Sequence, residues 1–181
     1  SGKSTLALNI AGLLIKKSPE TVRNHAYFYE INKPEDTIAI EEIRSLQQFL
    51  KLKVPSGDGK GINRVILIHE AERMRHEAQN ALLKTLEEPP AHAMFILATT
   101  EPHKVPATIL SRCQHISFHL ATREELVRSF TRIIEGENVT VDPEALEMIA
   151  DLSEGGFRDG AKLLEEVVAK SKDEKITVAM I

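Results

Sequence analysis

Residues 65–74, "VILIHEAERM", contain the feature that decides the fold, an apolar run that ends at two polar side chains, His69 and Glu70. Extended by one residue at the front, the run reads "RVILIH" (64–69), which is short, continuous and rich in β-branched residues. Apolar strands without alternation are typical of parallel sheets that helices cover on both faces. We therefore predict a buried strand over 64–69 with His69 and Glu70 at its carboxyl end.

Other segments extend this pattern in both directions along the chain. Further strands are predicted for "AYFYEI" at 26–31, "MFILATT" at 94–100 and the alternating run "QHISFHL" at 114–120. Helical patterns lie between the strands at 38–52, 74–88 and 106–112, and a Gly-rich loop spans 54–64. Alternating strands and helices predict an α/β core built on a parallel sheet.

After residue 120 the strand patterns stop. Three helical patterns follow at 122–137, 142–155 and 157–171, with Thr122 and Asp142 as N-cap candidates. We predict an α/β core over 1–120 and a helical lid over 121–174. Residues 175–181 are expected to begin a further C-terminal region.

The residues "SGKST" (1–5) stand directly before a helical pattern whose apolar positions are Leu6, Ile10, Leu13 and Leu14. Gly-Lys-Ser-Thr at a helix start matches the second half of a P-loop, in which backbone N–H groups bind phosphate oxygens. In this pattern Lys3 reaches the phosphates and Ser4 gives its hydroxyl to Mg²⁺. The first glycine of the pattern and the preceding strand are expected upstream of residue 1. The alternative interpretation of the short motif is a polar N-cap before an ordinary amphipathic helix.

The composition is that of a globular protein. Of 181 residues, 42% are hydrophobic and 28% are charged, which suffices for a buried core. The net charge of -4 means that any contact with DNA must come from a local basic face. The single cysteine, Cys113, excludes a disulfide framework and suits a reducing compartment. Since no apolar stretch approaches the roughly 18 residues of a membrane span, we expect a soluble cytoplasmic protein without a membrane partner.

Four motifs follow one another at consistent spacing, namely "GKST", "NALLKTLEEPP" (80–90), "FILATTEPHKVPATILSRC" (95–113) and "GGFRDG" (155–160). With these motifs the chain resembles the bacterial clamp-loader ATPases of the AAA+ superfamily, the gamma/tau and delta-prime subunits of DNA polymerase III. The similarity covers nearly the whole chain. It implies a P-loop AAA+ core, whose first strand precedes residue 1, followed by a small three-helix lid.

The resemblance implies that ATP is the bound nucleotide and Mg²⁺ its metal. It assigns nucleotide binding to Gly2, Lys3, Ser4 and Thr5. Glu70 matches the general base that orients water for attack on the γ-phosphate, and Thr100 matches a sensor hydroxyl near that water. Thr99 takes this role if the register slips by one residue. Apart from the family, Glu70 would be read as a surface carboxylate after a buried strand.

Two arginines match positions that act across larger distances. Arg112, in "SRC" (111–113), matches the arginine finger that enters a neighbouring subunit's site, which implies a ring or arc of subunits. Arg158 matches a second sensor that reaches back from the lid to the phosphates. Outside this family context, Arg112 would be read as a surface salt-bridge residue and Arg158 as the partner of Asp159.

His69 departs from the family pattern, in which an aspartate that organises Mg²⁺ is expected at this position. A neutral imidazole adds no negative charge near a hard cation that prefers oxygen ligands, so His69 is a doubtful metal residue. Phosphates, water and the hydroxyl of Ser4 bind most of the metal in such sites. We therefore expect ATP binding with slow or partner-dependent hydrolysis.

A zinc site is not expected. Many family members carry a four-cysteine zinc module between the P-loop and the acidic strand, and one cysteine cannot build it. Cys113, His115 and His119 would share one face of the predicted strand at 114–120, but along a line rather than around a point. This arrangement argues against a metal there.

The type of subunit stays open. The segment 29–53 resembles delta-prime sequences, whereas "TTEPHKVPATILSRC" (99–113) is closer to gamma/tau. In the family, helices of this region face the clamp or follow the DNA backbone, which gives four contact candidates, Arg44, Lys51, Lys53 and Lys60. A solvated amphipathic helix with scattered charges explains the same residues.

The resemblance implies an ATPase subunit of the DNA-directed DNA polymerase III holoenzyme. Together with other clamp-loader subunits, in a hetero-oligomer, it would bind and hydrolyse ATP to place the sliding clamp on primed DNA. The alternative is a delta-prime-like stator that donates Arg112 to a neighbour without hydrolysing ATP. His69 favours the stator, whereas "GKST" and Glu70 oppose it. A stand-alone P-loop kinase has no support, because no acceptor-binding lid motif is present.

Overall fold

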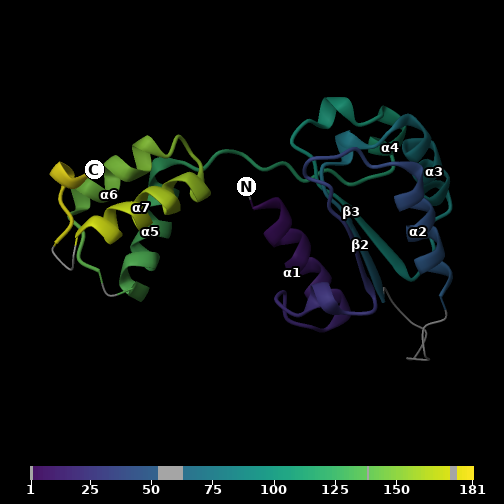
Figure 1. Cartoon of the computed structure of the whole chain (residues 1–181), viewed down its shortest axis with the longest axis horizontal. Coiled ribbons are helices and arrows are strands. Elements are labelled where there is room, and N and C mark those ends of the chain that lie inside the picture. The colour runs from purple at the N-terminus through teal and green to yellow at the C-terminus, as the bar shows by residue number, and fades with distance from the viewer. Residues whose placement is uncertain (1, 53–62, 138, 172–174) are drawn as a thin grey trace. The chain divides into compact units, whose positions relative to one another are not determined.

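The structure is a computed structural model that describes residues 2–52, 63–137, 139–171 and 175–181. It divides into two compact units, a core unit (Gly2–Ile116) and a lid unit (Ser117–Ile181), labelled by element in Figure 1. The core unit is a parallel sheet flanked by helices, and the lid unit is helical. Among the described helices, none combines the length and the hydropathy that crossing a membrane requires.

Three parallel strands form the sheet in the spatial order β1-β2-β3. They are β1 (Phe28–Ile31), β2 (Arg64–Ile68) and β3 (Ala93–Leu97). Every residue of β2 is buried, because this strand has a neighbour on each side and helices over both faces. The strands predicted over 26–31, 64–69 and 94–100 are thus confirmed, with ends that differ by up to three residues.

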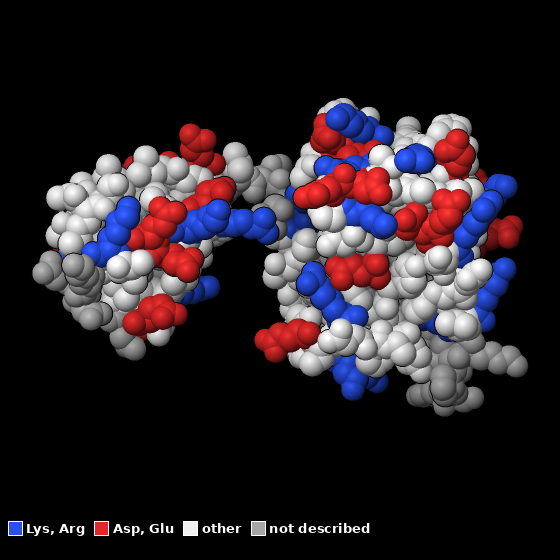
Figure 2. All heavy atoms as spheres, viewed as in Figure 1, with Lys and Arg blue, Asp and Glu red and all other residues white. Residues whose placement is uncertain are grey.

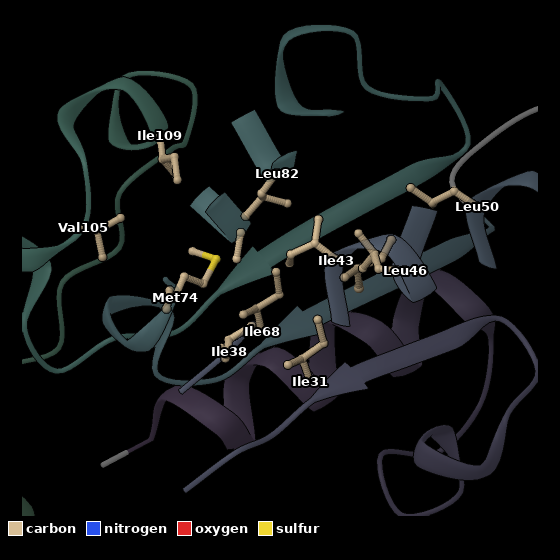
Figure 3. Packing of buried hydrophobic residues seen from close by; sticks show 13 residues of the cluster. Ile31, Ile38, Ile43, Leu46, Leu50, Ile68, Met74, Leu82, Val105 and Ile109 are labelled. Atoms are coloured by element: carbon tan, nitrogen blue, oxygen red, sulfur yellow. The ribbon is translucent and has the colours of Figure 1, made fainter. Parts of the chain in front are cut away.

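Helices cover the two faces of the sheet. Helix α1 (Lys3–Ile15) lies on one face, and α2 (Ile40–Lys51) and α3 (His76–Glu87) lie on the other (Figure 1). Successive β2 side chains point to opposite faces. Val65 and Leu67 accordingly pack in the cluster of α1, whereas Ile66 and Ile68 belong to the larger cluster under α2 and α3 (Figure 3).

The face that α1 buries differs from the one the leucine spacing predicts. Ala7 and Ala11 are buried against the sheet, whereas Leu13 is 80% exposed. Leu8, Leu14 and Ile15 flank this contact. Small side chains in the contact allow the helix backbone to lie close to β2, so the buried stripe is rotated away from Leu6, Ile10 and Leu13.

Short elements complete the core unit. A capping interaction precedes α2, where the Ala39 N–H donates to Glu42 Oε2 over 3.0 Å. The remaining elements are the 3₁₀ turns η1 (Val22–Asn24), η2 (Ala71–Arg73) and η3 (Pro102–Lys104) and the short helix α4 (Ala107–Leu110). The helices predicted at 38–52, 74–88 and 106–112 are confirmed as α2, α3 and α4.

The predicted strand at 114–120 is wrong, because the segment forms no strand and is exposed throughout. Its apolar residues Ile116, Phe118 and Leu120 are 61%, 43% and 76% exposed. Alternation indicates a segment that could cover one face of a sheet, but a strand also needs a neighbouring strand to pair with. Among the described residues, the three strands of the sheet pair only with one another.

Three helices build the lid unit, α5 (Arg123–Glu137), α6 (Pro143–Leu152) and α7 (Phe157–Ser171), as predicted. Their common cluster contains Phe130 of α5, Ile149 of α6 and Leu164 of α7. Gly160 allows α7 to approach α5 closely, since a Cβ at this position would overlap the ring of Phe130. This close contact accounts for Gly160, the last glycine of the "GGFRDG" motif.

The two predicted N-caps differ in their contacts. Thr122 forms a capping box with Glu125, with N–H to side-chain oxygen distances of 3.0 and 3.3 Å. The carboxylate of Asp142 makes no capping bond and instead lies 2.5 Å from Lys175 Nζ. Residues 175–181, expected to begin a further region, pack within the lid unit, where Ile176 is buried and η4 (Val178–Met180) contacts α6 and α7.

Candidate functional site

The carboxyl ends of the three strands bring several predicted site residues to one edge of the sheet. This carboxyl edge consists of the residues that end or follow the strands, namely Glu30–Ile31, His69–Glu70 and Ala98–Thr100. Helix α1 ends beside η1, which in turn contacts β1. η1 precedes β1, so the end of α1 lies near the amino ends of the strands. The start of α1 therefore lies toward their carboxyl ends.

The start of α1 is open to an anion. Leu6 N–H donates to Gly2 O over 2.9 Å and makes the first helical hydrogen bond, so the amides of Lys3, Ser4 and Thr5 have no partner within the helix. No acidic side chain stands in this first turn. The positive end of the helix dipole and the free amides therefore favour phosphate oxygens.

His69 is engaged by a carboxylate from the neighbouring strand. Its Nε2 lies 2.7 Å from Glu30 Oε1, and Arg23 Nη2 lies 3.3 Å from the same oxygen. Because an ionised carboxylate only accepts hydrogen bonds, this contact places an imidazole proton on Nε2. The side chain of His69 is only 12% exposed. Glu30 therefore places a carboxylate beside this largely buried imidazole, a contact that the sequence does not predict.

Glu70, the predicted general base, has an unusual backbone and an arginine partner. Its φ of 49° lies in the left-handed region, which costs a residue other than glycine about 1–3 kcal/mol. The bond from Ala71 N–H to Ala98 O, 3.0 Å long, holds this turn against the end of β3. Arg73 Nε lies 2.9 Å from Glu70 Oε2 in an ion pair without hydrogen-bond alignment, and Arg73 also donates to Pro34 O.

Thr100, the predicted sensor, contacts a second acidic residue. Its hydroxyl donates to Glu72 Oε1 over 3.2 Å, while the hydroxyl of Thr99 accepts the N–H of Glu101 over 2.9 Å. Burial raises the pKa of Glu72, but hydrogen bonds from Thr99, from its own backbone and from Thr100 outweigh it and leave the pKa below its usual value. These hydrogen bonds therefore favour the ionised form of Glu72, next to the carboxyl edge.

Arg112 follows α4 and is engaged on two sides. Its Nη2 lies 2.9 Å from Glu87 Oε1, and its Nη1 donates to Thr108 O over 2.7 Å. The side chain remains 35% exposed. The surface salt bridge considered for Arg112 is thus present in this structure.

Arg158 lies in the lid unit, as the second residue of α7, and is exposed. Within the described chain no ion pair joins Arg158 to Asp159. Gly155, just before α7, has a φ of 81° and accepts the Ala121 N–H over 3.0 Å. The turn that carries Arg158 is therefore anchored to the start of the lid unit.

The predicted contact residues of α2 are only partly described. Arg44 and Lys51 are exposed, and their spacing of seven residues puts them on one face of α2. Lys53 and Lys60 lie outside the described residues. Figure 2 shows acidic and basic side chains interspersed over the visible face, so any attraction for a polyanion depends on local groups.

No metal-ligand cluster appears among the described residues. No three His, Cys, Asp or Glu side chains there are grouped to hold a metal. His115 Nε2 lies 3.1 Å from Leu110 O. Burial raises the pKa of the Cys113 thiol.

Several residues of the edge were missed by sequence reasoning. Glu30, Glu72, Arg73 and Glu87 each contact a predicted site residue. The sequence contains one usable signal, the spacing Glu70-x-Glu72-Arg73 directly after the strand. It places three charged residues at the strand end, of which only Glu70 was predicted as a site residue. Pairing across strands, as between Glu30 and His69, requires the register of β1 and β2.

Comparisons with known proteins identify the family. A family model described as "DNA polymerase III, delta subunit" matches residues 15–122. The chain is 42% identical over 134 residues to the DNA polymerase III subunit tau of Bacillus subtilis, covering 74% of this chain and 23% of that one. It is 39% identical over 146 residues to the subunit gamma of Buchnera aphidicola, covering 81% and 39%. The chain thus spans well under half the length of these two relatives.

Solved structures share the fold. The RuvB Holliday junction branch migration motor of Thermotoga maritima superposes with a TM-score of 0.74 at 20% identity, covering 99% of this chain and 55% of that one. A DNA polymerase III gamma subunit-related protein of the same organism gives 0.54 at 23% identity, covering 97% and 60%. The core and lid together therefore have the AAA+ fold. With the family model spanning most of the core unit, the chain belongs to the DNA polymerase III clamp-loader subunits.

Proposed function

We propose that the chain is a clamp-loader subunit that binds ATP with Mg²⁺ and hydrolyses it slowly, within a hetero-oligomer that places the sliding clamp on primed DNA. The observation that carries this proposal is the free start of α1, with Lys3 and Ser4, on the same side of the sheet as Glu70 and Thr100. The phosphates would lie on the first amides of α1, and Lys3 would neutralise them.

Mg²⁺ fits this edge with few ligands from the protein. Ser4 offers a hydroxyl oxygen, whereas the carboxylate of Glu30 is taken by His69 and that of Glu70 by Arg73. When bound, Mg²⁺ would neutralise charge on the phosphates and withdraw electrons from the bond that breaks. The protein would therefore hold the metal chiefly through the nucleotide, with Ser4 as its own ligand.

Hydrolysis requires Glu70 to accept a proton from water, or to orient that water. Arg73 Nε lies 2.9 Å from Glu70 Oε2, so the guanidinium stands at a carboxylate oxygen that the water would otherwise approach. Slow turnover follows as long as Arg73 stays in contact with Glu70. Partner subunits that displace Arg73 would raise the rate.

The second candidate function is the stator, which donates Arg112 to a neighbour and does not hydrolyse ATP. The contact of Glu70 with Arg73 favours it, since it occupies the carboxylate that hydrolysis would use, and so does His69 in place of an aspartate. Either way, Arg112 would serve the neighbouring subunit's site, and the exposed face of α2 with Arg44 and Lys51 would contact clamp or DNA.

A titration of the full-length protein with Mg²⁺ and ATP tests the binding step. We expect measurable affinity for the wild type and a loss of at least about tenfold for Lys3→Ala, since one charge-assisted phosphate contact contributes roughly 1.5–3 kcal/mol. Lys17→Ala, an exposed lysine after the end of α1, is the matched control and should bind as the wild type does. No affinity in the wild type would contradict the proposal.

The rate of hydrolysis separates the two candidates. The subunit of the first candidate turns over ATP slowly alone and faster when clamp and primed DNA are added to the complete loader. The decisive sample is a complex in which only this chain can bind ATP. If the chain is a stator, this complex shows no ATP turnover above background, with or without clamp and primed DNA.

A further inference from the structure

The contacts of Arg112 come from two elements that rest on the same buried core. Glu87 is the last residue of α3, and Thr108 belongs to α4. Leu82 of α3 and Ile109 of α4 are buried in one cluster, and the two helices contact each other. The acceptors on either side of the guanidinium are therefore held at a constant separation by packing beneath them.

The end of α3 gives Glu87 a defined position. Glu88 follows with φ -126° and ψ 69°, outside the helical region, and Pro89-Pro90 come next. A residue before proline is disfavoured in the helical conformation, so the helix ends here by necessity. Glu87 thus stands at the fixed end of α3, where its side chain contacts Arg112.

Stability alone gives little reason for this pair. Its side chains are 35% and 46% exposed, and ion pairs at such exposure contribute little to folding. The larger effect is on conformational freedom, because a free arginine samples many rotamers and this one is held at Nη1 and Nη2. Within the described chain Nε–H has no acceptor, and a second Nη2–H remains available for phosphate oxygens.

We propose that Glu87 is the positioning residue of Arg112: it sets the orientation in which this subunit presents its guanidinium to the nucleotide of a neighbouring subunit. This inference rests on the proposed function of Arg112 in the neighbouring site. Glu87 pre-arranges the side chain before the subunits meet, so the neighbour's transition state gains its charge partner without a further search through rotamers.

The test uses the complete loader with Lys3→Ala in this chain, so that hydrolysis occurs at other subunits. Steady-state kcat and KM for ATP are measured for Arg112→Ala, Glu87→Gln, Glu87→Asp and the matched control Glu88→Gln, which changes an exposed neighbour. Arg112→Ala should lower kcat by at least about 100-fold, as loss of an arginine finger does. Glu87→Gln should lower kcat by about tenfold with KM unchanged, since misplacement of a positioned group has effects of this size.

Two further results complete the expectation. Glu87→Asp keeps the charge and should restore part of the rate, and Glu88→Gln should stay within about twofold of wild type, as surface changes do. If Glu87→Gln matches wild type while Arg112→Ala is impaired, Glu87 has no positioning role, although the proposed function of Arg112 stands. The same conclusion holds if Glu87→Gln lowers kcat only together with subunit assembly or melting temperature. An unimpaired Arg112→Ala overturns the proposed function of Arg112 itself.

Discussion

At the scale of single residues, several of the predicted site residues belong to pairs of charged side chains. His69 pairs with Glu30, Glu70 with Arg73 and Arg112 with Glu87. The identities of His69, Glu70 and Arg112 as site residues could be inferred from motif spacing. Their partners could not, because each pair joins residues whose proximity depends on strand register, a left-handed turn or the packing of α3 on α4.

Arg73→Gln should raise the intrinsic ATPase rate if Glu70 is the general base. Removing the guanidinium frees the carboxylate to act on water, and we expect a gain of roughly three- to tenfold, a small part of what a general base contributes. Arg75→Gln is the matched control, since this exposed arginine contacts Thr37 instead. Single-turnover hydrolysis by the full-length protein measures the effect. An equal gain in Arg73→Gln carrying Glu70→Gln would show that Glu70 is not the group released.

Glu72 should make the core unit sensitive to acid. Its pKa in the folded protein lies below the ordinary value of 4.5, so the stabilisation by Thr99 and Thr100 is fully present well above pH 4.5. It is lost as the pH falls through 4.5 and then through the lowered folded value. Urea unfolding of wild type and Glu72→Gln at several pH values measures this. The stability difference should shrink toward acid pH, and a constant difference would contradict the assignment.

At the scale of elements, periodicity found nearly all helices and strands, and the errors share one cause. The alternation of 114–120 and the leucine spacing of α1 both describe which side chains could be covered. Neither pattern shows which neighbouring strand or helix would cover those side chains. The segment 114–120 pairs with no described strand, and α1 uses alanines because β2 lies close beneath it.

A pair of substitutions tests the face that α1 buries. Ala11→Leu should destabilise the protein by about 1–3 kcal/mol, because Ala11 is fully buried against β2 and extra methylenes overpack the contact. Leu13→Ala should change the free energy of unfolding by no more than about 0.5 kcal/mol, because Leu13 is 80% exposed. Chemical denaturation measures both. A larger loss for Leu13→Ala than for Ala11→Leu would favour the stripe that the leucines suggest.

At the scale of the whole molecule, the fold class and family could be inferred from four short motifs, since their order along the chain is specific. Arg158 and Lys3 belong to different units, and their proposed cooperation would require the lid to close over a nucleotide. We propose this cooperation as the centre of nucleotide sensing, in addition to the site at the start of α1, because it would let the state of the nucleotide set the lid.

The affinity of the full-length protein for ATP, compared between wild type and Arg158→Ala, tests this centre most directly. Arg132→Ala, which removes an exposed arginine of α5, serves as the control. If the guanidinium of Arg158 binds the same triphosphate as the start of α1, its loss should weaken ATP binding by about tenfold or more, and ADP binding by less. ATP affinity that is the same in Arg158→Ala as in wild type would contradict the account.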